Sequence, residues 1–171
     1  MAFKTIEPMD FDIRIHHAFA KETALLTAGN KHSYNMMTIA WGTLGFMWNK
    51  PIVEVVVRPS RYTKEFIDTN DIFSLSFFGN SKKRELALLG SKSGRDFDKM
   101  HESGLTPFFM DNGGIGYDES RLIIVAKKLY TSQFRKQNFT SADIPETCYG
   151  DDDFHYRYIG EVIGIYDANL K

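Results

Sequence analysis

The sequence predicts a mainly β protein with short helices, folded as a small antiparallel barrel or sandwich. Short apolar runs rich in β-branched residues recur between turn signals along the 171 residues. The segments that join these runs lack the regular helical crossovers that a doubly wound parallel sheet requires. Because 43% of the residues are apolar and no long linker interrupts them, we expect one core and a single domain over residues 1–171.

The expected strands differ in how many of their faces are buried. In Ile72–Phe78, apolar residues at odd positions alternate with Ser74 and Ser76, which is typical of a strand with one packed face. Ile52–Val57 shows no such alternation apart from Glu54, so we expect it to be covered on both faces. The runs that we interpret as strands are Ala24–Ala28, Met36–Trp41, Ile52–Val57, Ile72–Phe78, Leu122–Leu129 and Ile159–Tyr166.

Helical segments are few and short. Thr63–Asn70 and Ser81–Leu89 each carry a small apolar face, and Gly90 is expected to be the C′ glycine of the second helix. Residues 131–156 are rich in polar and charged side chains and predict a long excursion from the barrel. In a compact domain such an excursion tends to be a functional flap or an oligomer contact.

Composition excludes several classes of function. Lys and Arg number 21 against 22 Asp and Glu, giving a formal charge of −1, so we expect no nucleic-acid partner. Cys148 is the one cysteine, which excludes an intrachain disulfide and fits a reducing, cytoplasmic location. The N-terminal residues lack the apolar core of a signal peptide, and no unbroken apolar run approaches the roughly 18 residues of a membrane span.

The segment Arg58-Pro59-Ser60-Arg61-Tyr62-Thr63 predicts an anion site. Pro59 ends the preceding strand, and the segment then places guanidinium and hydroxyl groups at the start of an expected helix, where unpaired backbone N–H groups favour an anion. Phosphate suits this donor set, and each charge-assisted bond would contribute about 1.5–3 kcal/mol. In the alternative interpretation, Ser60 and Thr63 only cap the helix while both arginines pair with surface carboxylates.

The segment Asn35-Met36-Met37-Thr38-Ile39-Ala40-Trp41 predicts a strand suited to a planar heteroaromatic ligand. Backbone groups can reach the polar edge of such a ring, while a methionine or tryptophan covers its apolar face. Alternation would place Met37, Ile39 and Trp41 on one face. The alternative is that this Met- and Trp-rich strand is plain core.

Taken in order, Asn35-x-x-Thr38-x-Ala40-Trp41, Arg58-x-Ser60-x-Tyr62-Thr63 and Ser93-Gly94-Arg95-Asp96-x-Asp98-Lys99 resemble the flavin reductase-like family of FMN-binding split barrels, and its flavoredoxin-like branch most closely. The resemblance extends over residues 21–166. It implies a Greek-key split β-barrel, a homodimer, and non-covalent FMN near the subunit interface.

The resemblance also implies which residues contact FMN. Asn35, Thr38 and Trp41 would line the isoalloxazine and ribityl region, Arg58–Thr63 would take the phosphate, and Lys99 would add a cation. The full expected cofactor-binding set is Asn35, Met37, Thr38, Ile39, Ala40, Trp41, Arg58, Ser60, Arg61, Tyr62, Thr63, Ser93 and Lys99. His155, which precedes Gly160-Glu161, is similar to a histidine on the family's last strand and is a candidate for a catalytic or nicotinamide-facing role.

The remaining clusters of polar residues predict no metal site, no nucleophilic catalysis and no Rossmann fold. His16 and His17 would point to opposite faces of a strand, and Asp151–Asp153 lacks the spacing of a calcium loop, so we expect no metal site. Cys148 has no identifiable base partner. No Gly-x-Gly-x-x-Gly follows a strand, so NADH or NADPH would not occupy a Rossmann fold.

The leading functional hypothesis is therefore an FMN-dependent oxidoreductase. It would take a hydride from NADH or NADPH and pass electrons to a free flavin, a small acceptor or a redox protein. The alternatives are an FMN-bound electron carrier with negligible nicotinamide turnover, and a dimer whose pocket is vestigial or binds another phosphorylated ring compound, such as a pyridoxal derivative.

Overall fold

A computed structural model describes residues 3–168, whose principal element is an eight-stranded sheet with the strand order β3-β2-β6-β9-β10-β5-β4 and with β1 beside β10. Its neighbouring strands all pair antiparallel. The strands are β1 (Lys4–Ile6), β2 (Ala24–Asn30), β3 (Ser33–Ile39), β4 (Gly42–Met47), β5 (Lys50–Val57), β6 (Ile72–Phe77), β9 (Leu122–Gln133) and β10 (Tyr156–Asp167), with a separate hairpin of β7 (Pro107–Phe109) and β8 (Ile115–Tyr117). The prediction of a mainly antiparallel β fold is confirmed.

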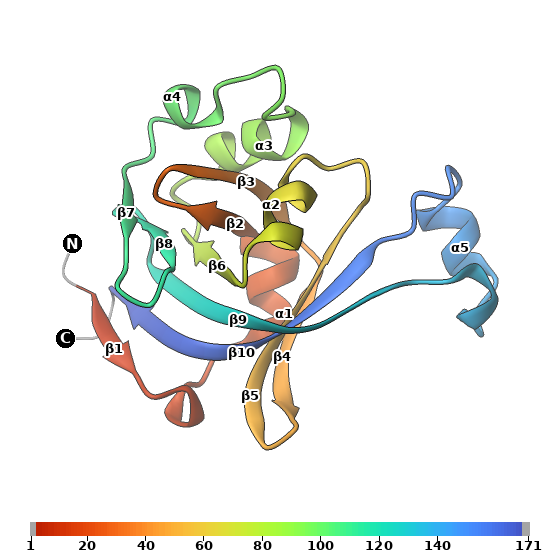
Figure 1. The fold of residues 1–171 in the computed structure, drawn as a ribbon, viewed down its shortest axis with the longest axis horizontal. Coiled ribbons are helices and arrows are strands. Elements are labelled where there is room, and N and C mark those ends of the chain that lie inside the picture. Colours follow the sequence, from red (N-terminus) through yellow and green to blue (C-terminus); the bar gives the residue numbers. More distant parts are fainter. Residues whose placement is uncertain (1–2, 169–171) are drawn as a thin grey trace.

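The helices are short and pack around the sheet. The longest, α3 (Lys83–Ser91), lies against β3, next to α2 (Thr63–Thr69) in Figure 1. The others are η1 (Pro8–Asp10), α1 (Ile15–His17), η2 (Ala18–Glu22), α4 (Lys99–Ser103), η3 (Lys136–Asn138) and α5 (Asp143–Cys148). No helix within residues 3–168 is both long enough and apolar enough to cross a membrane.

The sheet is open between its two outer strands. β3 and β4 lie at opposite ends of the strand order, although only residues 40–41 separate them in sequence. The chain therefore crosses the split in the barrel at Ala40 and Trp41. Trp41 lies outside β3, which ends at Ile39, so the expected strand Met36–Trp41 is too long at this end.

Two apolar clusters explain the alternation along β3. Met37 and Ile39 pack in the main cluster inside the barrel, whereas Met36 packs in a second cluster beneath α3. Both faces of the strand are therefore buried against apolar neighbours, which stabilises it strongly. In β5, one face of the expected strand Ile52–Val57 is fully buried through Val53, Val55 and Val57. The other face is covered in part, since Ile52 is buried while Glu54 and Val56 are half-buried.

Gly90 has a different role from the expected one. The helix runs one residue beyond it, to Ser91, so Gly90 is not a C′ glycine. A Cβ at Gly90 would lie 3.2 Å from the Cβ of Thr38, so the absence of a side chain lets α3 approach β3 closely. Thr38 completes this contact by donating from Oγ1 to the Leu86 carbonyl oxygen at 2.5 Å.

Residues 134–155 form an arm that projects from the barrel. β9 and β10 run together out of the barrel, and the arm between them carries η3 and α5 (Figure 1). This is the excursion expected for residues 131–156, except that the strands extend into it as far as Gln133 and from Tyr156.

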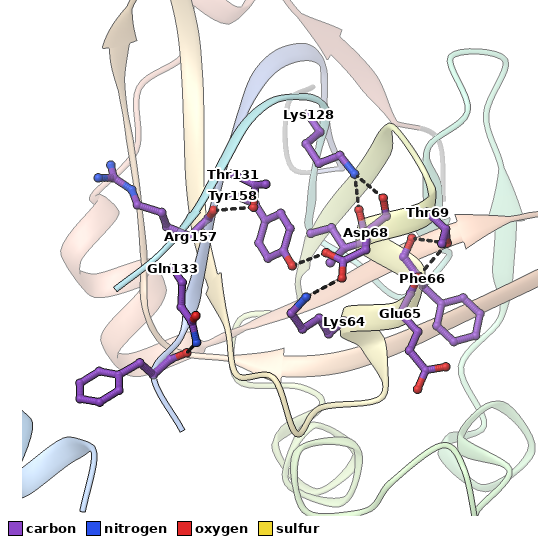
Figure 2. A network of polar contacts seen from close by, with 12 residues as sticks. Lys64, Glu65, Phe66, Asp68, Thr69, Lys128, Thr131, Gln133, Arg157 and Tyr158 are labelled. Atoms are coloured by element: carbon purple, nitrogen blue, oxygen red, sulfur yellow. Dashed lines mark hydrogen bonds and ion pairs between the residues drawn. The ribbon is translucent and has the colours of Figure 1, made fainter. Parts of the chain in front are cut away.

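Polar contacts hold α2 on the barrel wall (Figure 2). Asp68 accepts a hydrogen bond from the Tyr158 hydroxyl at 2.6 Å and pairs with Lys64 at 2.5 Å. Lys128 on β9 donates to the carbonyl oxygens of Ile67 and Asp68 at 2.6 and 2.9 Å. A cation at the end of a helix satisfies carbonyl groups that have no intrahelical partner. These contacts fix α2, and with it the segment Arg58–Thr63 that leads into the helix.

Candidate functional site

A cleft opens beside the split in the barrel, where the ends of β3 and β5 meet. We call it the tryptophan cleft; its volume is about 190 Å³. Its lining residues are Met37, Thr38, Ile39, Ala40, Trp41, Val56, Arg58, Arg61 and His155. The cleft combines apolar walls with guanidinium and imidazole groups, which is the usual chemistry of a site for a small planar ligand.

Trp41 and His155 form one wall of the tryptophan cleft. Their ring centroids are 5.1 Å apart with an interplanar angle of 46°. Trp41 is 47% exposed although it is large and aromatic, so much of its indole surface remains available to a ligand. The strand alternation expected for Met37, Ile39 and Trp41 does not extend to Trp41, because β3 ends at Ile39, although all three residues line the cleft.

A second cleft, of about 260 Å³, lies on the other side of Arg61. We call it the cationic cleft. It is lined by Met37, Ser60, Arg61, Tyr62, Thr63, Lys92, Ser93, Gly94 and Lys99. Basic side chains and hydroxyl groups dominate this lining, so it is suited to an anion such as phosphate.

Arg61 and Met37 belong to the lining of both clefts, which therefore adjoin. The Arg61 guanidinium donates from Nη1 to the Gly90 carbonyl oxygen at 3.2 Å. No ion pair joins Arg61 to a carboxylate within residues 3–168, so the alternative that both arginines pair with surface carboxylates fails for Arg61. One ligand with a ring at one end and an anionic group at the other fits this arrangement.

Lys99 is the most deeply buried cation of the cationic cleft. It is 6% exposed, and Nζ donates to the carbonyl oxygens of Met36 and Leu89, both at 2.8 Å. Burial, and secondarily the positive charge of Arg61, lower the pKa of Lys99 to about 8. Lys99 therefore remains mostly protonated at pH 7 and joins β3 to the end of α3.

Asn35 supports the cationic cleft from behind. Its Nδ2 donates to Thr63 Oγ1 at 2.9 Å, which ties β3 to the first residue of α2, and Asn35 does not line either cleft. A Cβ at Gly94 would lie 2.4 Å from Asn35 Oδ1, so only glycine lets the loop approach this amide. Thr63 Oγ1 is thus held by Asn35, and neither Ser60 nor Thr63 caps α2 through its side chain.

Arg58 is held by the arm. Nη1 pairs with Asp151 at 3.2 Å, and Nη2 donates to the Cys148 carbonyl oxygen at 2.6 Å. Ser60 makes a parallel contact, donating from Oγ to Asp153 Oδ2 at 2.5 Å. The carboxylate-pairing alternative is therefore observed for Arg58, and Asp151 and Asp153 join the arm to the segment Arg58–Thr63. Arg58 nevertheless lines the tryptophan cleft.

Sequence reasoning missed several residues of these clefts. Val56, Lys92 and Gly94 line them but were not expected to. Gly94 could have been found, because it lies inside the motif that also contains Ser93 and Lys99. His16, His17 and Cys148 line neither cleft. No group of three or more His, Cys, Asp or Glu side chains in the described part of the chain is placed to hold a metal ion.

His155 is half-buried and neutral. Burial, and next the positive charge of Arg58, lower the pKa of His155 to about 4, while Asp153 and Asp151 act in the opposite direction. The unfolded chain, with a histidine pKa near 6.5, binds more protons between pH 6.5 and pH 4 than the folded chain. The neutral state of His155 therefore contributes its full share of the unfolding free energy above pH 6.5. This contribution is lost as the pH falls toward 4.

We expect this effect to cost the wild type about 1–2 kcal/mol of unfolding free energy between pH 7 and pH 4, allowing for screening of the partly exposed ring. Urea unfolding at several pH values measures it. His155→Gln should remove this part of the pH dependence, whereas His101→Gln, at a histidine whose side chain is 82% exposed, should not. Equal pH dependence of the wild type and His155→Gln would contradict the assignment.

Comparisons of the sequence with known proteins give one partial match. No family model matches the chain. Among curated proteins, the uncharacterized protein YddH of Escherichia coli strain K12 is 32% identical over 99 residues, which is 54% of this chain and 52% of that protein. The match thus spans about half the length of this relative.

Solved structures match over most of the chain. A flavoredoxin from Methanosarcina acetivorans has a TM-score of 0.68 at 25% identity, covering 86% of this chain and 69% of that one. An FMN-binding protein from Thermus thermophilus with bound p-hydroxybenzaldehyde has a TM-score of 0.69 at 20% identity, covering 94% and 79%. A putative flavin reductase with a split barrel domain from Shewanella frigidimarina has a TM-score of 0.66 at 16% identity, covering 99% and 81%.

The chain therefore has the split-barrel fold of the flavin reductase-like and flavoredoxin proteins, as the ordered motifs in its sequence predict.

Proposed function

We propose that the protein is an FMN-binding oxidoreductase that uses NADH or NADPH as a transient co-substrate. The observation that carries the proposal is the position of Arg61 between the tryptophan cleft and the cationic cleft. FMN has an apolar planar ring at one end and a phosphate at the other, joined by a polyhydroxylated chain. The neighbouring structures that are named as flavoredoxin, FMN-binding protein and flavin reductase support this choice of ligand.

The donor set fits FMN. In the cationic cleft, Arg61, Lys99 and the hydroxyl groups of Tyr62 and Ser93 would hold the phosphate, whereas the Ser60 hydroxyl already donates to Asp153. In the tryptophan cleft, Met37 and Trp41 would cover the ring, since a thioether and an indole both pack well on an aromatic face. Thr38 and Ile39 would present backbone groups to the polar edge of the ring.

When bound, FMN supplies the redox chemistry, accepting a hydride from the reduced nicotinamide and returning two electrons to a free flavin, a small acceptor or a redox protein. The protein orients the ring and leaves one face accessible. The exposed indole of Trp41 indicates that the mouth of the tryptophan cleft is open, which favours access of a second molecule. An electron carrier with both ring faces covered would need a closed cleft.

Anaerobic reduction tests the proposal. Purified protein reconstituted with FMN should show a flavin spectrum that bleaches on addition of NADH or NADPH and recovers when free flavin is added. A bound flavin that neither nucleotide bleaches would contradict the use of NADH or NADPH and would favour the electron-carrier hypothesis. A protein that stays colourless after incubation with FMN would contradict FMN binding itself.

We also propose that the protein is a homodimer. Large apolar side chains are exposed at the tip of the β4–β5 hairpin and on the neighbouring part of β9: Phe46 (61%), Met47 (38%), Trp48 (53%), Leu129 (40%) and Tyr130 (46%). Trp48 and Tyr130 are in contact, with ring centroids 6.3 Å apart. Exposed large apolar side chains gathered in one region are typical of a protein–protein interface. The projecting arm adds a further surface for a second copy.

The double substitution Phe46→Asp with Trp48→Asp should convert a dimer to a monomer. Two carboxylates buried in an apolar interface would lose their hydration without gaining a partner, and this weakens the association. Aspartate tolerates the left-handed backbone of Trp48, where φ is 54°, so the turn itself should not be strained. Light scattering after gel filtration measures the mass. Met9→Asp, at a residue that is 69% exposed on η1, is the control and should leave the mass unchanged. A monomeric wild type would contradict the dimer.

A further inference from the structure

A hydrogen bond links the arm to the tryptophan cleft. The Tyr149 hydroxyl lies 2.9 Å from Nδ1 of His155. Tyr149 belongs to the arm, follows α5 and does not line the tryptophan cleft, whereas His155 does. Tyr149 therefore contacts the wall of the tryptophan cleft through His155 without lining the cleft itself.

The surroundings hold Tyr149 in place. It is 3% exposed, its ring stacks on Phe154 with centroids 4.7 Å apart, and the Arg58 guanidinium carbon lies 5.3 Å from its ring centroid. Phe139 packs against the same ring at 5.8 Å. Few alternative rotamers are open to a tyrosine packed in this way, so the direction of its hydroxyl is fixed.

The hydrogen-bonding requirement of this buried tyrosine decides which nitrogen of His155 carries the proton. Burial raises the pKa of Tyr149, so the hydroxyl keeps its proton at neutral pH. A buried hydroxyl proton needs an acceptor, and the hydrogen bonds of residues 3–168 offer it only Nδ1 of His155. Nδ1 is then unprotonated, and a neutral imidazole carries its proton on Nε2.

The charges around His155 favour the same state. Arg58 and Arg61 oppose a further positive charge, and Asp151 and Asp153 of the arm only partly offset them. Burial is the largest effect and acts in the same direction as the arginines. The carboxylates are drawn toward Arg58 and Ser60, because Asp151 pairs with Arg58 and Asp153 accepts from Ser60.

We propose that Tyr149 is a positioning residue that holds His155 as a neutral Nε2–H donor on the wall of the tryptophan cleft. Within the described residues Nε2 has no hydrogen-bond partner, so its N–H is available to an acceptor atom of a ligand in the cleft. The identity of that ligand as a flavin or nicotinamide rests on the proposed function. The proton position itself does not.

Long-range 1H–15N spectra of cofactor-free protein labelled with 15N-histidine test the proposal. The wild-type spectrum should show His155 protonated on Nε2, unprotonated on Nδ1, and uncharged from pH 8 to pH 5. In Tyr149→Phe the two tautomers should exchange. Tyr34→Phe, which removes the hydroxyl from a tyrosine whose ring packs on Phe109, is the matched control and should leave the His155 signals unchanged. A protonated Nδ1 in the wild type overturns the proposal without any variant, so a folding defect in Tyr149→Phe cannot obscure the result.

A second readout separates this inference from the proposed function. Tyr149→Phe should weaken FMN and riboflavin equally, by about three- to tenfold, which is the size of one neutral hydrogen bond. A change in FMN binding alone would contradict a role at the ring. If the wild type shows the expected tautomer but binds no flavin, the proposed function fails and the role of Tyr149 stands. If flavin binds and Nδ1 is protonated, the reverse holds.

Discussion

Replacing Arg61 with alanine is expected to weaken FMN binding by about 10- to 100-fold while changing riboflavin binding by no more than a few-fold. Arg61 lines the cationic cleft, and a guanidinium–phosphate contact contributes about 1.5–3 kcal/mol. Riboflavin lacks the phosphate and so loses little when the cation is removed. Fluorescence titration of the purified variant with both ligands gives the two dissociation constants.

The comparison needs a control for the loss of one positive charge. Arg84→Ala serves this purpose, since Arg84 is exposed on α3 and lines neither cleft. It should leave both dissociation constants near the wild-type values. Loss of FMN and riboflavin affinity to the same extent in Arg61→Ala would show that the residue supports the ring or the fold, and the phosphate assignment would be wrong.

Lys99→Met should lower the unfolding free energy by about 2–4 kcal/mol, because it removes a charged donor that two carbonyl oxygens share in a buried setting. Lys99 Nζ donates to Met36 on β3 and to Leu89 in α3, so the loss should loosen the contact between these two elements. Methionine retains the length of the side chain, which limits any cavity. Urea unfolding monitored by circular dichroism measures the change.

Lys82→Met is the matched control. Lys82 makes an ion pair with Glu85 three residues along the chain, and both side chains are partly exposed. Such a pair contributes little, so the variant should lie within about 0.5 kcal/mol of the wild type. If Lys99→Met were equally mild, the buried ammonium would not be the tie between β3 and α3 that its hydrogen bonds indicate.

The sequence predicts the central strands well because their apolar residues form the core. β2, β5, β9 and β10 contain the runs interpreted as strands, and β6 ends at Phe77, one residue short of the expected strand. β4 could not be predicted in this way, since Gly42–Met47 lies at the edge of the sheet and several of its residues are exposed. β9 extends beyond Leu129 because Tyr130–Gln133 pair with β10, a long-range contact that local hydrophobicity does not encode.

The candidate site was predictable in composition but not in its contacts. Trp41 and Lys99 belong to the three motifs, and Met37 and Arg61 belong to the two segments predicted to bind a ring and an anion. All four line a cleft. The partner of Arg58 is Asp151, which lies 93 residues away in the sequence, so no local pattern could show that the arm holds this arginine. The contact between Tyr149 and His155 depends on the same placement of the arm. The sequence offers no signal for it, because tyrosine is common in ordinary cores.

A crystal structure of the protein grown with FMN would show directly whether the two adjoining clefts hold one ligand. We expect the phosphate within hydrogen-bond distance of Arg61 and close to Lys99, with the ring in the tryptophan cleft against Trp41. FMN bound elsewhere, or bound with its phosphate in solvent and its ring away from Trp41, would contradict the assignment of the two adjoining clefts.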